Sequence, residues 1–187
     1  MPARSLFVIL FLCLLAACAG VARAADSAAA PAILVLGDSL SAAYGIRVDQ
    51  GWVALLQARL RAKGYGHRVV NASSSGETTG GALARLPRAL QAHRPQIVIV
   101  ELGGNDGLRG LPFPYIRRNL ESIIALSQQA EARILLVGMK IPPNYGPVYA
   151  RQFEALFGEP RKKESEFFTH GTGVPDGVCG MMLRSST

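Results

Sequence analysis

The chain has 187 residues, of which 49% are hydrophobic and 18% charged, a composition that predicts one globular domain and excludes a disordered or fibrous protein. Lys and Arg number 20 against 13 Asp and Glu, but the positive charges form no long block, which argues against a nucleic-acid-binding protein. Three cysteines and three scattered histidines exclude a disulfide framework and argue against a multi-Cys or His-rich metal centre.

Residues 1–24 are predicted to be a signal peptide. Arg4 supplies a positive start, and an unbroken apolar run follows over 6–19. That run is shorter than the roughly 18–20 residues that a membrane-spanning helix needs. Ala22-Arg23-Ala24 matches an A-x-A cleavage site. We therefore expect an exported bacterial protein, periplasmic or secreted, whose mature form begins near Ala25.

Cys18 supports an alternative interpretation of the same segment. Leu15-Ala16-Ala17-Cys18 resembles the bacterial lipobox, in which the cysteine is lipidated and becomes the new N-terminus. The protein would then be a lipoprotein anchored to a membrane through Cys18, and residues 19–31 would form a tether.

From residue 32 on, strands and helices are predicted to alternate. Apolar runs at 32–36, 67–71, 96–100 and 133–137 predict strands, and Pro87 is expected to bend the second of four intervening helices. This order predicts a parallel sheet covered by helices on both sides. The apolar positions that predict the helices are Trp52, Leu55, Leu56 and Leu60; Leu83, Leu86 and Leu90; Ile116, Leu120, Ile123 and Ile124; and, after Pro147, Tyr149, Phe153, Leu156 and Phe157.

Small, polar and glycine-rich segments follow the first three predicted strands, at 37–41, 71–78 and 101–106. Ligands of a parallel sheet bind outside the carboxyl ends of its strands. Helix capping explains one such segment, but three at one edge indicate a site. Gly76 would let a backbone N–H approach a substrate, and Asn105 offers an amide donor. A serine hydroxyl with convergent donors is what acyl transfer requires, because its intermediate carries negative charge on the former carbonyl oxygen.

Two acidic residues in these segments are expected to be structural. Asp38 is expected to stabilise a turn or to cap a helix. A metal site formed by Asp38 and Asp106 is the less simple interpretation. Glu101 directly precedes the Gly-Gly pair and is expected to hydrogen-bond nearby loops rather than to take part in catalysis. His67 and His93 precede strands, so both are expected at the opposite end of the sheet from the three segments.

The three segments resemble the conserved blocks of the GDSL, or SGNH, hydrolases. Gly37-Asp38-Ser39-Leu40 resembles the first block, Gly76 matches the second, and Gly-Gly-Asn-Asp at 103–106 matches the third. The likeness extends to the exported arylesterase, thioesterase I and lysophospholipase L1 group of that family. The stretches similar to this group are 36–44, 71–73, 84–87, 101–109 and 141–146.

The resemblance implies a fold, a site and a substrate class. The implied fold is a flavodoxin-like three-layer α/β/α sandwich with a parallel sheet, the SGNH hydrolase fold. Ser39 would be the nucleophile, and the backbone N–H groups of Ser39 and Gly76 with the Asn105 side chain would form the oxyanion hole. The family needs no cofactor or metal, and the expected substrate is a small ester or a lysophospholipid.

The tail at 159–187 departs from the family. The resemblance calls for a D-x-x-H element near the C-terminus, whose histidine activates the serine, and this sequence contains none. An apolar strand and a closing helix are also lacking there. We therefore expect an incomplete hydrolase domain at 25–158 and a divergent tail produced by a shifted frame or a truncated gene model. The alternatives are that His170 is a relocated base or that the protein is a binding protein with a decayed active site.

The sequence thus predicts a serine esterase that hydrolyses carboxylic esters or thioesters through an acyl-enzyme on Ser39. The alternative is a catalytically impaired acyl- or lipid-binding protein, or a truncated product that lacks the base. We also expect lower stability than in related proteins, since a missing final strand would leave a sheet edge unpaired.

Overall fold

The computed structural model describes residues 30–158, in which strands and helices alternate as predicted. The strands are β1 (Ala32–Gly37), β2 (Arg68–Asn71), β3 (Ile97–Glu101) and β4 (Arg133–Leu136). The helices are α2 (Trp52–Ala62), α3 (Thr79–His93), α4 (Gly104–Leu108), α5 (Phe113–Gln129) and α6 (Pro147–Ala155), with 3-10 turns η2 (Val48–Gln50) and η3 (Pro143–Tyr145). The predicted signal peptide, Cys18, the divergent tail and His170 lie outside the described residues.

The sheet is parallel, with the strand order β2-β1-β3-β4. Leu34 at the middle of β1 lies opposite Val70 of β2 and Val98 of β3. The chain passes from β1 outward to β2 and then returns to the other side of β1 to form β3. In sheets of this kind, ligands bind where the strand order reverses, which here is outside the carboxyl ends of β1 and β3.

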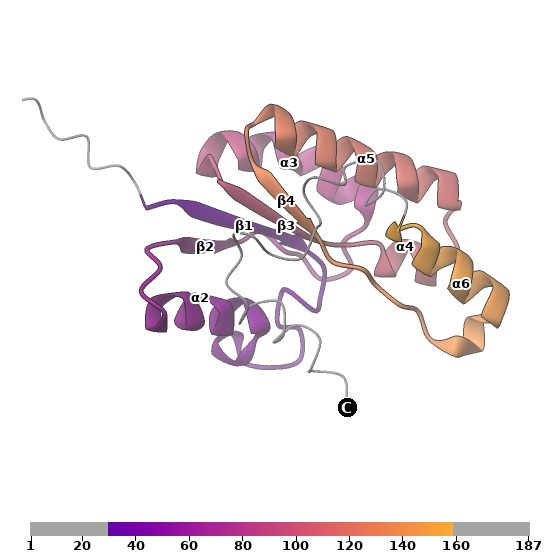
Figure 1. The fold of residues 1–187 in the computed structure, drawn as a ribbon. Helices are drawn as coiled ribbons and strands as arrows, with labels where there is room; N and C mark the ends of the chain where they lie inside the picture. Colours follow the sequence, from indigo (N-terminus) through magenta and orange to yellow (C-terminus); the bar gives the residue numbers. More distant parts are fainter. Residues whose placement is uncertain (1–29, 159–187) are drawn as a thin grey trace, which may run out of the picture.

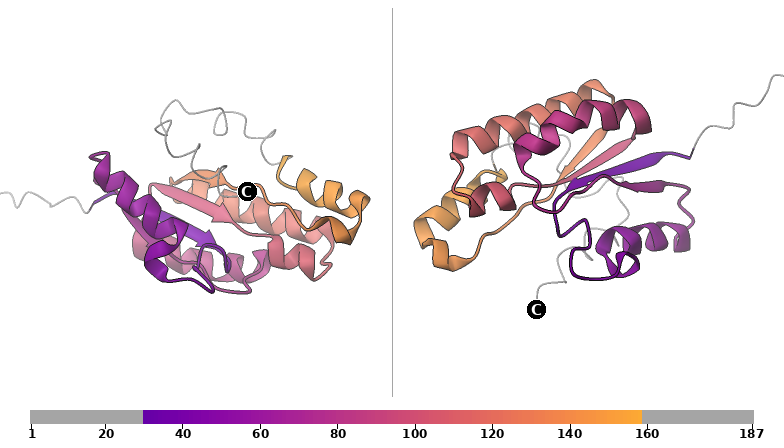
Figure 2. Two further views of the ribbon diagram at one scale, coloured as in Figure 1. Left: turned by 90° about the horizontal axis from the view of Figure 1, so that it is seen from below. Right: turned by 180° about the vertical axis from the view of Figure 1, so that it is seen from behind.

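Helices cover both faces of the sheet, so the predicted three-layer sandwich is confirmed (Figure 1; two further views in Figure 2). Leu34 and Leu36 of β1 point to the face on which α3 and α5 pack, whereas Ile33 and Val35 point to the face covered by α2. Successive side chains of a strand alternate between faces, and a strand buried on both faces must therefore be continuously apolar. All six residues of β1 are buried.

Two helices differ in detail from the predictions. In α2 the buried residues are Val53, Leu56 and Leu60, and Leu55 is 47% exposed. Spacings of three and four residues place the first three on one face, and adjacent Leu55 and Leu56 cannot share it. The five-residue helix α4 was not predicted, because it lies inside the glycine-rich segment and carries no apolar periodicity. Pro87 lies inside α3, as predicted, and the helix extends on both sides of it.

Candidate active site

Ser39 lies in a tight turn directly after β1. The turn is closed by three hydrogen bonds: Leu40 N donates to Asp38 Oδ1 (3.0 Å), Ala42 N to the Asp38 carbonyl (2.9 Å) and Tyr44 N to the Ser39 carbonyl (3.0 Å). Asp38 is 3% exposed, while Ser39 is half-buried at the surface of the turn. The expected turn role of Asp38 is thus confirmed, and its bonds hold the backbone on both sides of Ser39.

Asn105 joins the turn of Ser39 to the loop of Gly76. Its amide Nδ2 donates to the Glu77 carbonyl (2.9 Å) and lies 3.3 Å from Asp38 Oδ2, a second acceptor. Gly76 is exposed and has φ +76, a conformation that glycine adopts without strain, and its carbonyl accepts a bond from Arg109 Nη2 (3.1 Å). The three residues implied by the family resemblance are therefore brought to one edge of the sheet from three separate segments.

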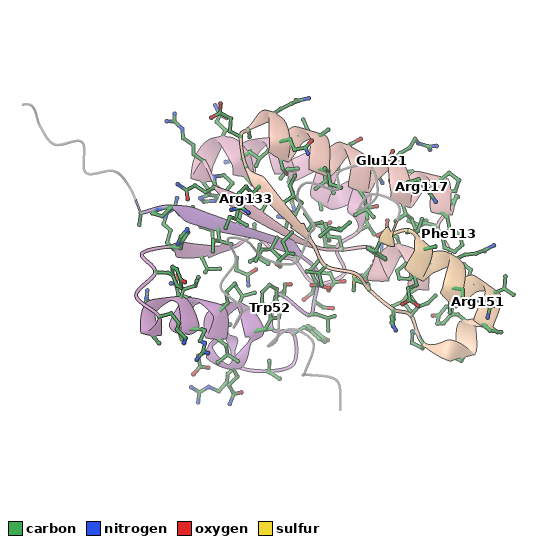
Figure 3. The ribbon with its side chains drawn as sticks, viewed as in Figure 1. Trp52, Phe113, Arg117, Glu121, Arg133 and Arg151 are labelled. Carbon is green, nitrogen blue, oxygen red and sulfur yellow. The ribbon has the colours of Figure 1, made fainter. Side chains whose placement is uncertain are left out.

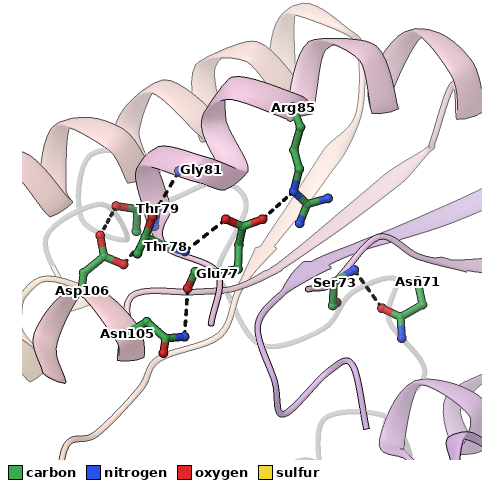
Figure 4. A network of polar contacts seen from close by, with 9 residues as sticks. All are labelled: Asn71, Ser73, Glu77, Thr78, Thr79, Gly81, Arg85, Asn105 and Asp106. Carbon is green, nitrogen blue, oxygen red and sulfur yellow. Dashed lines mark hydrogen bonds and ion pairs between the residues drawn. The ribbon is translucent and has the colours of Figure 1, made fainter. Parts of the chain in front are cut away.

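A buried carboxylate ties the start of α3 to α4 (Figure 4). Asp106 is fully buried and accepts hydrogen bonds from Thr79 N (2.9 Å) and Thr79 Oγ1 (2.6 Å). Asn119 of α5 donates to the same Thr79 hydroxyl (3.0 Å), and Thr78 caps α3 by accepting from Gly81 N (3.2 Å). The loop that carries Gly76 therefore ends on a fixed support. The role of Asp106 has no signal in the sequence beyond its place in the third block.

Ser41, two residues after Ser39, is the centre of a second network. Its hydroxyl donates to Glu101 Oε2 (2.6 Å) and accepts from Trp52 Nε1 (3.2 Å), and its carbonyl accepts from Asn71 Nδ2 (2.7 Å). Trp52 lies at the start of α2 and points toward the sheet (Figure 3). The expected hydrogen bonding of Glu101 to a nearby loop is confirmed, but the partner was not predictable, since it lies 60 residues away in the chain.

Burial perturbs the carboxyl groups of Asp38 and Glu101. Desolvation raises the pKa of Glu101 to about 7, against the opposing effect of the Ser41 hydrogen bond. Desolvation also raises the pKa of Asp38, while the Leu40 N–H lowers it and the charge of Asp106 raises it further. Within residues 30–158 no group of three or more His, Cys, Asp or Glu side chains is arranged to hold a metal ion.

Phe153 of α6 and Phe157, which follows that helix, support the glycine-rich turn after β3. A Cβ on Gly107 would lie 2.6 Å from the ring of buried Phe153, and one on Gly103 would lie 3.2 Å from Phe157. The two rings pack edge to face with centroids 5.4 Å apart. These glycines therefore allow the close approach of aromatic side chains, in addition to the positive φ of +109 at Gly103.

The hydroxyl of Tyr149 also binds this turn, donating to the Gly107 carbonyl (2.8 Å). Its ring packs against Phe113 at the start of α5, with centroids 4.9 Å apart. Helix α6 thereby connects the turn of Asn105 to α5. The sequence predicted α6 and its apolar residues but not this contact.

The described histidines do not reach Ser39. His67 immediately precedes β2, and the carbonyl of His93 at the end of α3 accepts a bond from Arg68, the first residue of β2 (3.0 Å). Both histidines therefore lie at the amino edge of the sheet, as predicted, whereas Ser39 lies at the carboxyl edge. Among residues 30–158, then, the structure brings no imidazole base to the serine.

Comparison with known proteins places these features in a family. Residues 35–161 match the model of the GDSL-like lipase/acylhydrolase family. Esterase TesA of Pseudomonas aeruginosa is 47% identical over 173 residues, an alignment that covers 90% of this chain and 85% of that protein. An arylesterase of Vibrio mimicus is 42% identical over 82% of this chain and 72% of its own length. Thioesterase 1/protease 1/lysophospholipase L1 of Escherichia coli is 44% identical, over 70% of this chain and 62% of that protein.

Solved structures agree with the sequence comparisons. The crystal structure of TesA superposes with a TM-score of 0.70 at 49% identity, covering 72% of this chain and 74% of that one. AlinE4, an SGNH-hydrolase family esterase, superposes with a TM-score of 0.69 at 40% identity, over 73% of each chain. The parallel sheet with its flanking helices is thus the SGNH hydrolase fold, and the chain belongs to the GDSL-like lipase/acylhydrolase family.

Proposed function

We propose that this protein hydrolyses carboxylic esters or thioesters through an acyl-enzyme on Ser39. The observation that carries the proposal is the position of Asn105, whose amide bonds both Glu77, next to Gly76, and Asp38, next to Ser39. A serine hydroxyl, a glycine backbone N–H and an amide donor thus converge at one sheet edge, the arrangement that acyl transfer needs. Similar proteins are described as an esterase, an arylesterase and a thioesterase/lysophospholipase, which supports short esters, thioesters and lysophospholipids as substrates.

A second candidate function is acyl or lipid binding without efficient turnover. It is favoured by the lack of an imidazole near Ser39 among residues 30–158 and by the missing D-x-x-H element in the sequence. A serine without an adjacent base is a weak nucleophile. Loss of the base in a serine hydrolase leaves a residual acceleration of roughly 10³–10⁴ over water, from the oxyanion hole and binding.

Hydrolysis of p-nitrophenyl butyrate by the full chain, Ser39→Ala and Ser122→Ala distinguishes the two. Ser122 is an exposed serine of α5, far in the chain from the site, and its alanine variant controls for handling and folding. Turnover that is lost in Ser39→Ala and kept in Ser122→Ala supports the esterase. An alkyl phosphonate, the class of inhibitor bound to the related esterase EstA, should then label Ser39, as read by mass spectrometry of its peptide.

The same assay identifies the base. If His170 is relocated to Ser39, His170→Ala should lose activity to the level of Ser39→Ala. A chain that folds, as judged by circular dichroism, but neither turns over ester nor takes up phosphonate would contradict the esterase and support the binding function.

We further propose that the protein is exported, either as a soluble periplasmic or secreted form or as a lipoprotein anchored through Cys18. Mass spectrometry of the N-terminal peptide after expression in a bacterium tests this. An N-terminus near Ala25 supports the soluble form, a diacylglyceryl group on Cys18 supports the anchor, and an intact Met1 contradicts export.

A further inference from the structure

Ser41 is held by hydrogen bonds to residues of three different elements. Glu101 comes from the end of β3, Trp52 from the start of α2 and Asn71 from the end of β2, and each makes a hydrogen bond to Ser41 of 3.2 Å or less. Ser41 is 1% exposed and Glu101 is 5% exposed, so water competes little for these bonds. Ser41 is therefore an anchor between the sheet, a helix and the turn that carries Ser39.

The turn after Ser39 relies on hydrogen bonds more than on packing. Leu40 and Tyr44 are 64% and 78% exposed, so packing does not hold them. Ala43 is buried, but it has φ +59, a conformation that a residue with a Cβ adopts only under constraint from its surroundings. The bonds of Ser41 contribute to that constraint, because they fix the residue two positions before Ala43.

The last residue of β1 is shaped around the Ser41–Glu101 bond. A Cβ on Gly37 would lie 2.5 Å from Ser41 Oγ and 3.0 Å from Glu101 Oε2. Gly37 does not have a positive φ, so its backbone conformation does not explain the glycine. The glycine is explained by the space that the hydrogen bond between Ser41 and Glu101 needs.

The hydrogen bond between Ser41 and Glu101 has a defined direction. Trp52 Nε1 donates to Ser41 Oγ, which directs the hydroxyl proton of Ser41 toward Glu101. A hydrogen bond to an ionised carboxylate is about twice as strong as a neutral one. Its other oxygen, Oε1, is buried without a partner, and the charge of Asp38 faces the carboxyl from the turn before Ser39.

We propose that Glu101 is a positioning residue for Ser39, which it holds in place through the hydroxyl of Ser41. This inference rests on the proposed role of Ser39 as nucleophile. Glu101 itself touches no reacting atom. Its effect is to keep the turn in one geometry, and a displacement of about 1 Å of a reacting group can cost on the order of a hundredfold in rate.

Amide hydrogen exchange in the full chain tests the positioning without requiring turnover. In Ser41→Ala and Glu101→Ala, the amides of Ala42 and Tyr44, which close the turn, should exchange about tenfold faster or more than in the wild type. Glu101→Gln should restore most of the protection, because its amide oxygen can accept from Ser41. The matched control is Glu154→Gln, a change at an exposed glutamate of α6, and it should leave the turn unaffected.

Exchange at the core strand residues Leu34 and Val98 reports global stability in the same experiment. Faster exchange of the turn amides with unchanged exchange of the core amides supports the proposal. Turn amides that exchange at the wild-type rate in both alanine variants overturn it. If Glu101→Ala does not fold, Ser41→Ala decides, since it removes a single oxygen atom. The only tryptophan of the chain, Trp52, should also change its fluorescence when the Ser41 hydroxyl is removed.

Ester hydrolysis separates this inference from the proposed function. Glu101→Ala should lower kcat by about tenfold or more with a smaller change in KM, and the Ser41→Ala/Glu101→Ala double variant should be no slower than Ser41→Ala, because both remove one interaction. Additive losses in kcat would overturn the proposal. A wild-type chain that neither turns over ester nor takes up phosphonate refutes the nucleophile, while the exchange of the turn amides still decides whether Glu101 holds them.

Discussion

Replacing Asp106 with asparagine tests the buried support between α3 and α4. The carboxylate is fully buried and accepts two hydrogen bonds from Thr79, one from the backbone N–H and one from the hydroxyl. Asparagine keeps the size of the side chain but offers one oxygen and an NH₂ group. Its oxygen can accept only one of the two bonds, and when it accepts from the Thr79 N–H, the proton of the Thr79 hydroxyl loses its charged acceptor.

The expected cost follows from these two contacts. A hydrogen bond to a charged group contributes roughly 1.5–3 kcal/mol, and a buried donor left without a partner costs about 1–3 kcal/mol. The second bond can survive in weaker, neutral form, so we expect Asp106→Asn to lower the free energy of unfolding by about 2–3 kcal/mol. The start of α3 should also move, and with it the loop of Gly76, so ester hydrolysis should fall as well.

Urea unfolding followed by circular dichroism measures the change. The midpoint should decrease while the slope stays constant, because the surface exposed on unfolding is unaltered. Asp49→Asn is the matched control, since Asp49 is an exposed carboxylate of η2 whose hydrogen bonds go to neighbouring Arg47. This variant should unfold at the same urea concentration as the wild type. If the urea midpoint of Asp106→Asn also matches the wild type, the hydrogen bonds of Asp106 do not stabilise the contact between α3 and α4.

Three further outcomes are expected. Phe153→Ala should lower the free energy of unfolding in urea by about 3–5 kcal/mol, because it opens a cavity under the turn of Gly107. Gly107→Ala should lower it by about 1–3 kcal/mol through overpacking, and the double variant should lose less than the sum of the two. Burial raises the pKa of Glu101 from 4.5 to about 7, so the free energy of unfolding should be highest below about pH 4.5 and should fall by about 3 kcal/mol as the pH rises to about 7. Glu101→Gln should abolish this dependence of the unfolding free energy on pH, and an unchanged dependence would contradict the assignment. Arg109→Ala removes the hydrogen bond to the Gly76 carbonyl and should lower kcat while leaving the urea midpoint unchanged. A shifted midpoint would show that this exposed bond stabilises the fold instead.

Much of the fold was predictable because its elements leave local signals. A strand buried on both faces must be apolar throughout, and the runs at 32–36, 96–100 and 133–137 coincide with β1, β3 and β4 to within a residue at each end. The amphipathic spacing of α5 and α6 is equally local. The error at Leu55 arose where two adjacent leucines competed for one face of α2, a choice that packing against Ile33 and Val35 decides.

The candidate site was predictable only as a set of residues. Ser39, Gly76 and Asn105 stand out because small polar segments follow apolar strands, and because these segments resemble the blocks of a family. The helix α4, which positions Asn105, has no apolar periodicity to mark it, since Leu108 is its one apolar residue. Its formation depends on contacts with other elements, because Phe153 packs against Gly107 and Thr79 of α3 donates two hydrogen bonds to Asp106.

By itself, the sequence determined the strand order along the chain, the parallel α/β class, the family and the lack of a D-x-x-H element, because each of these depends on residues that are near one another in the chain. Only the tertiary structure decided which polar groups meet. Ser41 and Glu101 lie 60 residues apart, and Thr79 and Asp106 lie 27 apart. Such pairs form because the parallel sheet brings the ends of its strands to one edge, where burial makes each unpaired donor or acceptor costly and so selects the partner that satisfies it.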